Sequence, residues 1–326
     1  EEEYRKKGKN KDIVPVVQFR KECREFAEKW IEVQKKEFRR LGVEGDWENP
    51  YLTMSYEAEA QIVRELGKFL LDGSLYKGAK PVLWSVVEKT ALADAEVEYA
   101  DHTSNTIYVK FRISKSKINE LVDNSILIWT TTPWTIPGNR ALAYGKDLDY
   151  MLLHILSVKD NSLATVNDKI VIAKELQQSV MAGCGISEAK ILKLFKGSEL
   201  EGIECDHPFN GLGYDFVVKA FDADFVSLEQ GTGVVHVAPG HGADDYNLGM
   251  RNGVEVVQTV NDEGIYNDHA PGFEGEHVYK VDLKIADKLK QLGKLFGQGK
   301  LRHSYPHSWR SKAPLIFRNT PQWFIS

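Results

Sequence analysis

Two short segments of the chain carry the side chains best suited to chemistry. In the first, residues 129–139, Thr130, Thr131 and Thr132 come directly before Pro133. A strand that runs into a proline-stiffened turn can present hydroxyls and backbone amides together, so this segment could bind a polar ligand. Threonine is also a favourable strand residue, which leaves a purely structural role as the alternative.

The second segment, residues 231–246, combines glycines with histidines and acids. Its glycines precede a predicted strand and a predicted helix, where they let the backbone pass close to a bound group. His236 lies on the strand, where it could also be a core histidine, and His241 follows in the turn. Asp244 and Asp245 fall in the first helical turn, where carboxylates can bind a cation or stabilise the helix end. Imidazole and carboxylate groups together could also hold a divalent metal.

Other common catalytic devices are missing from the sequence. It contains no Gly-x-Ser-x-Gly nucleophile elbow, no His-Glu-x-x-His zinc helix and no Gly-rich phosphate loop ending in Lys-Ser or Lys-Thr. Acyl-enzyme chemistry, zinc-protease chemistry and nucleotide hydrolysis by these routes therefore have no support.

Hydrophobic spacing predicts the elements that must position the two segments. Apolar residues recur every three or four positions over residues 15–41 and 55–71, which indicates two helices. Strand patterns follow from about residue 96, at residues 107–113, 125–129, 150–156, 169–173, 216–219, 234–238 and 255–260. Short helical patterns interrupt them at residues 174–182, 243–250 and 280–292. We predict an α+β fold, in which a closed or nearly closed β-barrel-like domain with peripheral helices follows a helical segment.

The bulk composition is that of a soluble protein. The chain has 326 residues, of which 42% are hydrophobic and 27% charged, enough for one large and one smaller domain. No run approaches the roughly 20 apolar residues of a membrane span, and no secretory peptide is visible. Cys23, Cys184 and Cys205 are odd in number and far apart, which favours a reducing compartment. We therefore expect a cytoplasmic protein that does not contact a membrane.

Charge is distributed unevenly along the chain. The net charge of -5 argues mildly against a nucleic-acid partner, for which a pI above roughly 9 is usual. After Asp287, however, no acidic residue follows, while a basic strip contains Lys288, Lys290, Lys294, Lys300, Arg302, Arg310, Lys312 and Arg318. This basic strip could follow a phosphate backbone, or it could be a solvated surface.

The two segments resemble the editing pocket of the isoleucyl-tRNA synthetase family. The run from Thr130 to Asn139 and the run from Gly231 to Tyr246 are similar to the two peptides that form that pocket. Trp134 distinguishes the chain from the leucyl and valyl relatives, whose corresponding peptide reads Thr-Thr-Arg-Pro. The resemblance extends over essentially the whole chain through stretches at residues 45–51, 90–99 and 304–324.

The resemblance implies that the chain corresponds to the insertion between the halves of a synthetase catalytic domain. Residues 1–95 would be a helical connective segment, residues 96–303 the editing domain and residues 304–326 the segment that returns to the catalytic domain. The family's nucleotide-binding signatures, called HIGH and KMSKS, do not occur here. We therefore expect neither activation of isoleucine with ATP nor any cofactor.

Some members of the family hold a structural zinc with paired cysteines where the chain enters and leaves the editing domain. The corresponding positions here are Ser85, Glu88, Ser308 and Ser311. Because zinc requires thiolate, imidazole or carboxylate ligands, we expect no structural zinc and no other metal.

The resemblance also implies roles for individual residues. The expected reaction is hydrolysis of valine wrongly attached to isoleucine tRNA, by a positioned water without a protein nucleophile. Asp245 would pair with the α-ammonium of the substrate, and His236 would exclude the larger isoleucine side chain. Thr131 and Thr132 would contact the terminal adenosine or the attacking water, and would be catalytic together with Asp245. The remaining expected substrate-binding residues are Thr130, Trp134, Asn139, His241 and Asp244.

The expected partners are the 3′ end of isoleucine tRNA with misattached valine and the remainder of the synthetase, with the chain as a monomer. The basic strip and the cluster Arg5, Lys6 and Lys7 would contact tRNA phosphates. Two alternatives stay open: a non-catalytic tRNA-binding module, and a metal-dependent hydrolase that uses the histidines and aspartates of residues 236–245.

Overall fold

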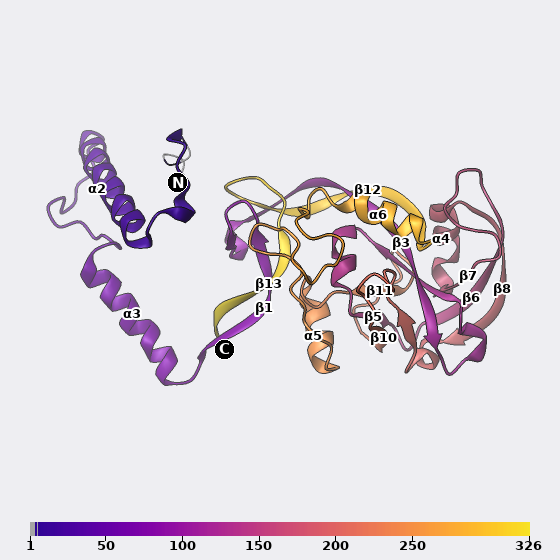
Figure 1. Cartoon of the computed structure of the whole chain (residues 1–326). Helices are drawn as coiled ribbons and strands as arrows, with labels where there is room; N and C mark the ends of the chain where they lie inside the picture. The colour runs from indigo at the N-terminus through magenta and orange to yellow at the C-terminus, as the bar shows by residue number, and fades with distance from the viewer. Residues whose placement is uncertain (1–3, 5) are drawn as a thin grey trace. The chain divides into compact units, whose positions relative to one another are not determined.

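The structure, a computed structural model, describes residues 4 and 6–326. It divides into two compact units, Glu1–Lys77 with Trp323–Ser326, and Gly78–Gln322 (Figure 1). The chain passes from one unit to the other within the strands β1 (Leu75–Ser85) and β13 (Ile316–Ile325). The domain boundaries that we expect after residues 95 and 303 remain predictions.

The first unit is helical. It contains η1 (Lys11–Ile13), α2 (Val16–Arg40) and α3 (Tyr56–Leu71), and the two predicted helices are thereby confirmed. The hydroxyl of Ser55 caps α3 by accepting a hydrogen bond from the Ala58 amide at 3.2 Å. Neither α2 nor α3 contains a buried residue. In the part of the chain that the structure describes, no helix is both long and apolar enough to cross a membrane.

The second unit is built on a large mixed sheet. Its strands are β3 (Val97–Lys115), β4 (Ser125–Thr130), β5 (Ala141–Tyr144), β6 (Asp149–Val158), β7 (Lys169–Ala173), β8 (Ile186–Lys196), β9 (Glu204–Asp206), β10 (Val217–Asp222), β11 (Val234–Val237) and β12 (Leu295–Ser308). Around them lie η2 (Asp94–Glu96), η3 (Asn119–Leu121), η4 (Pro133–Gly138), η5 (Lys174–Leu176), α4 (Gln177–Cys184), η6 (Gly197–Leu200), α5 (Ala243–Arg251) and α6 (Asp282–Gln291). A smaller sheet orders β13, β1 and β2 (Thr90–Ala91).

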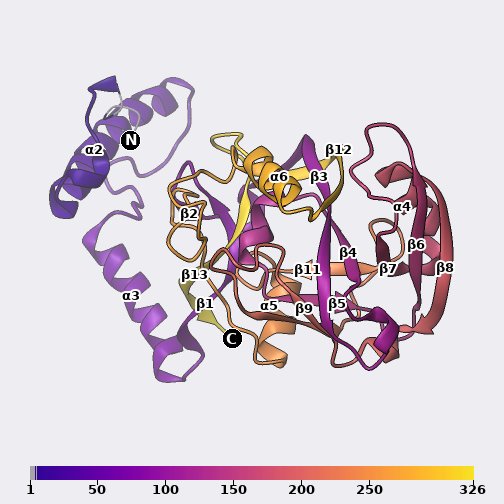
Figure 2. The same ribbon diagram turned by 45° about the vertical axis from the view of Figure 1, so that its right-hand side comes forward.

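The large sheet curls on itself without closing (Figure 2). Its strand order is β11-β5-β10-β9-β3-β4-β7-β6-β8, with β12 paired to β3. The segment before β11 still reaches the other end of the sheet, because Tyr150 donates to the Gly233 carbonyl at 2.7 Å and the Ala173 amide to the Thr232 carbonyl at 2.8 Å. Among the described residues no ladder joins β8 to β11. The α+β, barrel-like fold is confirmed, but a closed barrel is not found.

The core of the unit lies against β3 and β4. Val109, Phe111 and Ile113 of β3 are fully buried, as the alternating pattern predicts. Residues 126–128 of β4 are also fully buried, and β3 and β4 form an antiparallel ladder in which Ile107 is opposite Thr130. This ladder places the end of β4, where the first predicted segment begins, at a rigid edge of the core.

The predicted strand at residues 255–260 is wrong. The segment is an extended loop whose single β-bridge joins Val260 to Tyr266. Two of its backbone carbonyls bind side chains: that of Gln258 accepts from the side-chain amide of Asn267 at 2.8 Å, and that of Val260 from the Arg318 guanidinium at 3.3 Å. The apolar residues that suggest a strand are buried by this loop packing instead.

The positions that correspond to zinc ligands in some relatives do come together. Glu88 accepts hydrogen bonds from the hydroxyls of Ser85 and Ser308, the latter at 3.1 Å. The Ser308 hydroxyl also accepts from the Ser311 amide at 3.5 Å. Hydrogen bonds around one carboxylate thus tie the end of β1 to the end of β12. The expected absence of zinc stays a prediction.

Candidate functional site

The two predicted segments converge on one small cavity of ≈ 200 Å³. The first segment supplies the end of β4 and the helical turn η4, and the second supplies β11 and the first turn of α5. The residues that line the cavity are Trp129, Thr130, Thr132, Thr135, Val235, His236, Ala238, His241 and Asp245. This volume is below the roughly 300 Å³ at which drug-sized ligand sites begin, so it suits a small group such as an amino-acid side chain.

The threonines of the first segment form a chain of hydroxyls. Where β4 ends, the Thr130 hydroxyl accepts from the Thr132 amide at 3.1 Å and lies 3.1 Å from the Thr132 hydroxyl. Thr135 donates to the Thr132 carbonyl at 2.9 Å, and its hydroxyl oxygen lies 3.3 Å from that of Thr132. These bonds fix the turn and leave hydroxyl groups along one wall of the cavity.

His236 forms a neutral wall beside the hydroxyls. Its Nδ1 lies 2.8 Å from the side-chain amide nitrogen of Asn139, and its Nε2 lies 2.8 Å from the Thr135 hydroxyl. Because an amide NH₂ can donate but not accept, Nδ1 must be the acceptor and Nε2 carries the proton. Burial lowers the pKa of His236 to about 3. The imidazole is therefore uncharged at neutral pH and acts by shape and hydrogen bonding.

Asp245 places a carboxylate among the residues that line the cavity. One carboxylate oxygen accepts from the Ala238 amide at 2.8 Å, which ties the first turn of α5 to the end of β11. Burial, together with the charge of Asp244, raises the pKa of Asp245 to about 6. A partly desolvated carboxylate of this kind gains from pairing with a cation such as an ammonium group.

His241 of the second segment also lines the cavity, and we call its ring the floor of the cavity. Its Nδ1 donates to the Phe317 carbonyl at 3.1 Å, and its Nε2 lies 2.7 Å from the Thr259 hydroxyl. The ring packs edge-on against Trp134 with 4.8 Å between centroids. Burial lowers the pKa of His241 to about 4. The ring is therefore neutral and held on both sides.

This arrangement does not offer a metal site. His236 and His241 each use both ring nitrogens in hydrogen bonds within the protein. Across the described residues, no group of three or more His, Cys, Asp or Glu is placed to hold a metal ion. The metal-dependent alternative therefore has no donor set in the segment from which we expected it.

The remaining predicted residues lie outside the first cavity. Thr131 and Trp134 line a second cavity of ≈ 330 Å³, which shares Thr132 with the first. Asn139 is fully buried behind His236, whereas Asp244 is exposed and lines neither cavity. The geometry therefore gives little support for direct contact of Thr131 or Asp244 with a ligand in the first cavity.

Sequence reasoning missed four residues that line the first cavity: Trp129, Thr135, Val235 and Ala238. For Thr135 a signal was present, because it follows Thr132 by three positions in a helical turn and so shares its face. No local pattern separates the other three from ordinary strand residues.

Four of the eight residues of the basic strip form ion pairs within the protein. Arg302, Arg310 and Lys312 pair with Asp101, Glu96 and Glu98, respectively. Arg318 is 5% exposed and pairs with Asp262, so its assignment to a tRNA-contacting surface is wrong. Of the N-terminal basic cluster, Arg5 lies outside the described residues. A tRNA-contacting role for the other basic residues remains a prediction.

A protein-family model and curated relatives match the whole chain. A family model described as tRNA synthetases class I (I, L, M and V) matches residues 1–326. The isoleucine–tRNA ligase of Pelagibacter ubique (strain HTCC1062) is 57% identical over 326 residues, which are 100% of this chain and 36% of the relative. That of Gluconobacter oxydans (strain 621H) is 48% identical over 339 residues, which cover 100% of this chain and 35% of the relative.

The chain spans about a third of the length of these curated relatives. Among solved structures, one described as the crystal structure of GlLeuRS-CP1 is similar with a TM-score of 0.44 and 15% sequence identity. The similarity covers 59% of this chain and 97% of that one.

Proposed function

Because this chain belongs to the class I tRNA synthetases of the isoleucine, leucine, methionine and valine group, we propose that it carries out the editing step of an isoleucine–tRNA ligase. The reaction is hydrolysis of valine that has been wrongly attached to isoleucine tRNA. The 57% identity to a ligase of this specificity supports the choice of amino acid. The partners are then the 3′ end of the tRNA and the remainder of the ligase, and the chain acts as a monomer in the cytoplasm.

A second site is required for a physical reason. A pocket that accepts isoleucine cannot strongly reject valine, because one missing methylene is worth only about 1–3 kcal/mol, and isoleucine–tRNA ligase is itself the established example of this limit. A smaller pocket inverts the selection, since it admits valine and excludes isoleucine by steric overlap. We assign this role to the ≈ 200 Å³ cavity, which His236 and Trp129 line.

The proposed mechanism uses positioning instead of a protein nucleophile. Asp245 pairs with the α-ammonium group, which places the valine side chain against His236. A water molecule held by the hydroxyls of Thr130 and Thr132 attacks the ester carbonyl carbon. The resulting oxyanion collapses and the ester C–O bond breaks. The ribose oxygen leaves with a proton from the attacking water, giving valine and free tRNA. Holding an already labile ester beside a positioned water can supply much of the required acceleration.

The remaining predicted residues have supporting roles in this proposal. Asn139 holds Nδ1 of His236, Trp134 packs against His241, and Thr131 contacts the nucleotide side of the ester from the second cavity. The observation that carries the proposal is the convergence of the threonine turn and Asp245 on one small cavity.

Deacylation assays test the proposal. The chain should release valine from Val-tRNA for isoleucine and leave Ile-tRNA intact. Asp245→Ala should abolish the release, because the ammonium group loses its partner, whereas Asp244→Ala, the exposed neighbour, should retain it. Full activity in Asp245→Ala would remove the assignment of that residue. Binding of the tRNA without any deacylation by the unaltered chain would favour a non-catalytic tRNA-binding module.

A further inference from the structure

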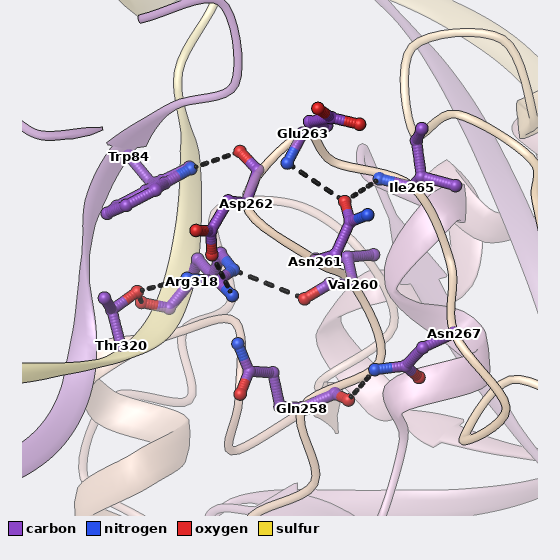
Figure 3. Close-up of polar contacts among 10 residues, drawn as sticks. All are labelled: Trp84, Gln258, Val260, Asn261, Asp262, Glu263, Ile265, Asn267, Arg318 and Thr320. Atoms are coloured by element: carbon purple, nitrogen blue, oxygen red, sulfur yellow. Dashed lines mark hydrogen bonds and ion pairs between the residues drawn. The ribbon is translucent and has the colours of Figure 1, made fainter. Parts of the chain in front are cut away.

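Arg318, on β13, is a buried arginine whose guanidinium joins separate segments of the second unit (Figure 3). It pairs with the carboxylate of Asp262 at 2.8 Å and donates to the Val260 carbonyl at 3.3 Å. The guanidinium also lies 4.9 Å from the ring centroid of Trp84 on β1, and the Trp84 indole donates to the Asp262 carbonyl at 2.8 Å. We call these residues, Arg318, Asp262, Val260 and Trp84, the arginine clasp.

The neighbours of the arginine clasp hold the floor of the candidate site. Phe317, directly before Arg318, accepts the hydrogen bond from Nδ1 of His241 at 3.1 Å. Thr259, directly before Val260, binds Nε2 of the same ring at 2.7 Å. Both bonds to the His241 ring therefore come from residues adjacent in sequence to members of the clasp.

The loop that carries His241 has little freedom apart from these contacts. The Asn319 amide, on the other side of Arg318, donates to the Gly240 carbonyl at 2.8 Å. Gly240 passes so close to the Val257 carbonyl that an added Cβ would collide with it. The same loop begins at Ala238, whose amide holds the carboxylate of Asp245. A shift of β13 relative to residues 257–262 would therefore move the cavity floor and the ammonium site together.

We propose that Arg318 is a positioning residue of the valine pocket, acting through His241 and the loop 238–242. This inference rests on the proposed editing function. A guanidinium supplies a planar fork of donors that a lysine ammonium cannot reproduce, so Arg318 can satisfy several partners at once while remaining buried. Cavity volume and ammonium position are then both set by how firmly the clasp holds β13.

Arg318→Lys tests the inference, because it keeps the charge and removes the fork. We expect the Val-tRNA concentration for half-maximal deacylation to rise about tenfold, since displacement of about 1 Å in a supporting group can cost up to 10²-fold. The ratio of Ile-tRNA to Val-tRNA hydrolysis should rise as the floor loosens, a change that reduced folding alone would not produce. Thr259→Val, which removes one His241 contact without touching the clasp, should shift the ratio in the same direction.

Arg112→Lys is the matched control. Like Arg318, Arg112 forms ion pairs, here with Asp123 and Asp206, but it is an exposed residue of β3 that does not line the cavity. Its substitution should leave the ratio of Ile-tRNA to Val-tRNA hydrolysis unchanged. An unchanged ratio in folded Arg318→Lys would overturn the inference. If Arg318→Lys does not fold, the ratio of Ile-tRNA to Val-tRNA hydrolysis in Thr259→Val tests the inference instead. An unchanged ratio in that variant would contradict the positioning path, by which Arg318 acts on the pocket through His241.

A second readout separates this inference from the editing proposal. The ¹⁵N-detected imidazole signals of His241 report its hydrogen bonds whether or not the chain deacylates tRNA. They should change in Arg318→Lys and not in Arg112→Lys. If the unaltered chain hydrolyses no aminoacyl-tRNA but the signals change as expected, the editing function fails and the positioning path stands. Unchanged His241 signals in Arg318→Lys would refute the path itself.

Discussion

At neutral pH, the charge of Asp245 should make the protein less stable than the variant Asp245→Asn, whose side chain is uncharged. Its carboxyl pKa rises from 3.8 to about 6 in the folded chain, chiefly through burial. The folded state therefore binds a proton more tightly than the unfolded state does. Stability from this group is fully present below pH 3.8 and is lost as the pH rises through about 6. Asp245→Asn removes the charge and keeps an oxygen that can accept from the Ala238 amide, so it isolates this effect.

The size of the effect follows from the pKa. At 1.36 kcal/mol per pH unit, the change in the pKa from 3.8 to about 6 means that the charged carboxylate destabilises the folded chain by at most about 3 kcal/mol at pH 7.5. At pH 4.5 most of the carboxyl in the folded state is already protonated, and the expected difference is about 1 kcal/mol. Between pH 4.5 and pH 7.5, the free energy of unfolding of Asp245→Asn should therefore rise by about 2 kcal/mol relative to that of the unaltered chain.

Urea unfolding followed by tryptophan fluorescence at a series of pH values measures this difference. The expected result is a gain in the free energy of unfolding of Asp245→Asn over the unaltered chain that grows as the pH rises. The reasoning would be refuted by a difference that is constant with pH or that shrinks as the pH rises. A site that gains stability when its charge is removed is typical of residues retained for function.

Further predictions concern the wall, the pH profile and the contacts of Glu88. His236→Ala should begin to hydrolyse Ile-tRNA, reducing the discrimination by about tenfold or more, because the wall against the additional methylene is lost; continued sparing of Ile-tRNA would show that another residue sets the limit. Deacylation of Val-tRNA should fall as the pH drops below about 6, where Asp245 becomes protonated; a rate that is flat from pH 5 to 7.5 would contradict the ion pair. Glu88→Ala should lower the free energy of unfolding by about 1–3 kcal/mol, since the hydroxyls of Ser85 and Ser308 lose their acceptor. An unchanged urea midpoint would contradict a stabilising role for these hydrogen bonds.

Elements whose apolar residues repeat at a simple spacing can be predicted from the sequence alone. The helices over residues 15–41 and 55–71 and the alternating strand over residues 107–113 are found as predicted, because their apolar spacing matches one buried or amphipathic face. The loop at residues 255–260 fails for the opposite reason. Its apolar side chains are buried, but its carbonyls are satisfied by distant side chains such as Arg318, and no local pattern encodes those partners.

In the candidate site, too, some features can be predicted from the sequence and others depend on contacts in the folded chain. The resemblance identifies the correct peptides, but it does not separate Thr130 and Thr132, which line the small cavity, from Thr131, which lies on the second one. That choice depends on the bond between the Thr130 hydroxyl and the Thr132 amide, which turns the chain where β4 ends. Arg318 could not be placed either, because its charge suggests a surface residue and its partner Asp262 is far from it in sequence.

The most direct test of the central claim is a structure of the chain with a non-hydrolysable analogue of valyl-adenosine. We expect the valine side chain in the ≈ 200 Å³ cavity against His236, with the α-ammonium group within hydrogen-bond distance of Asp245. An analogue bound elsewhere, with this cavity empty and Asp245 without a contact to the amine, would contradict the account.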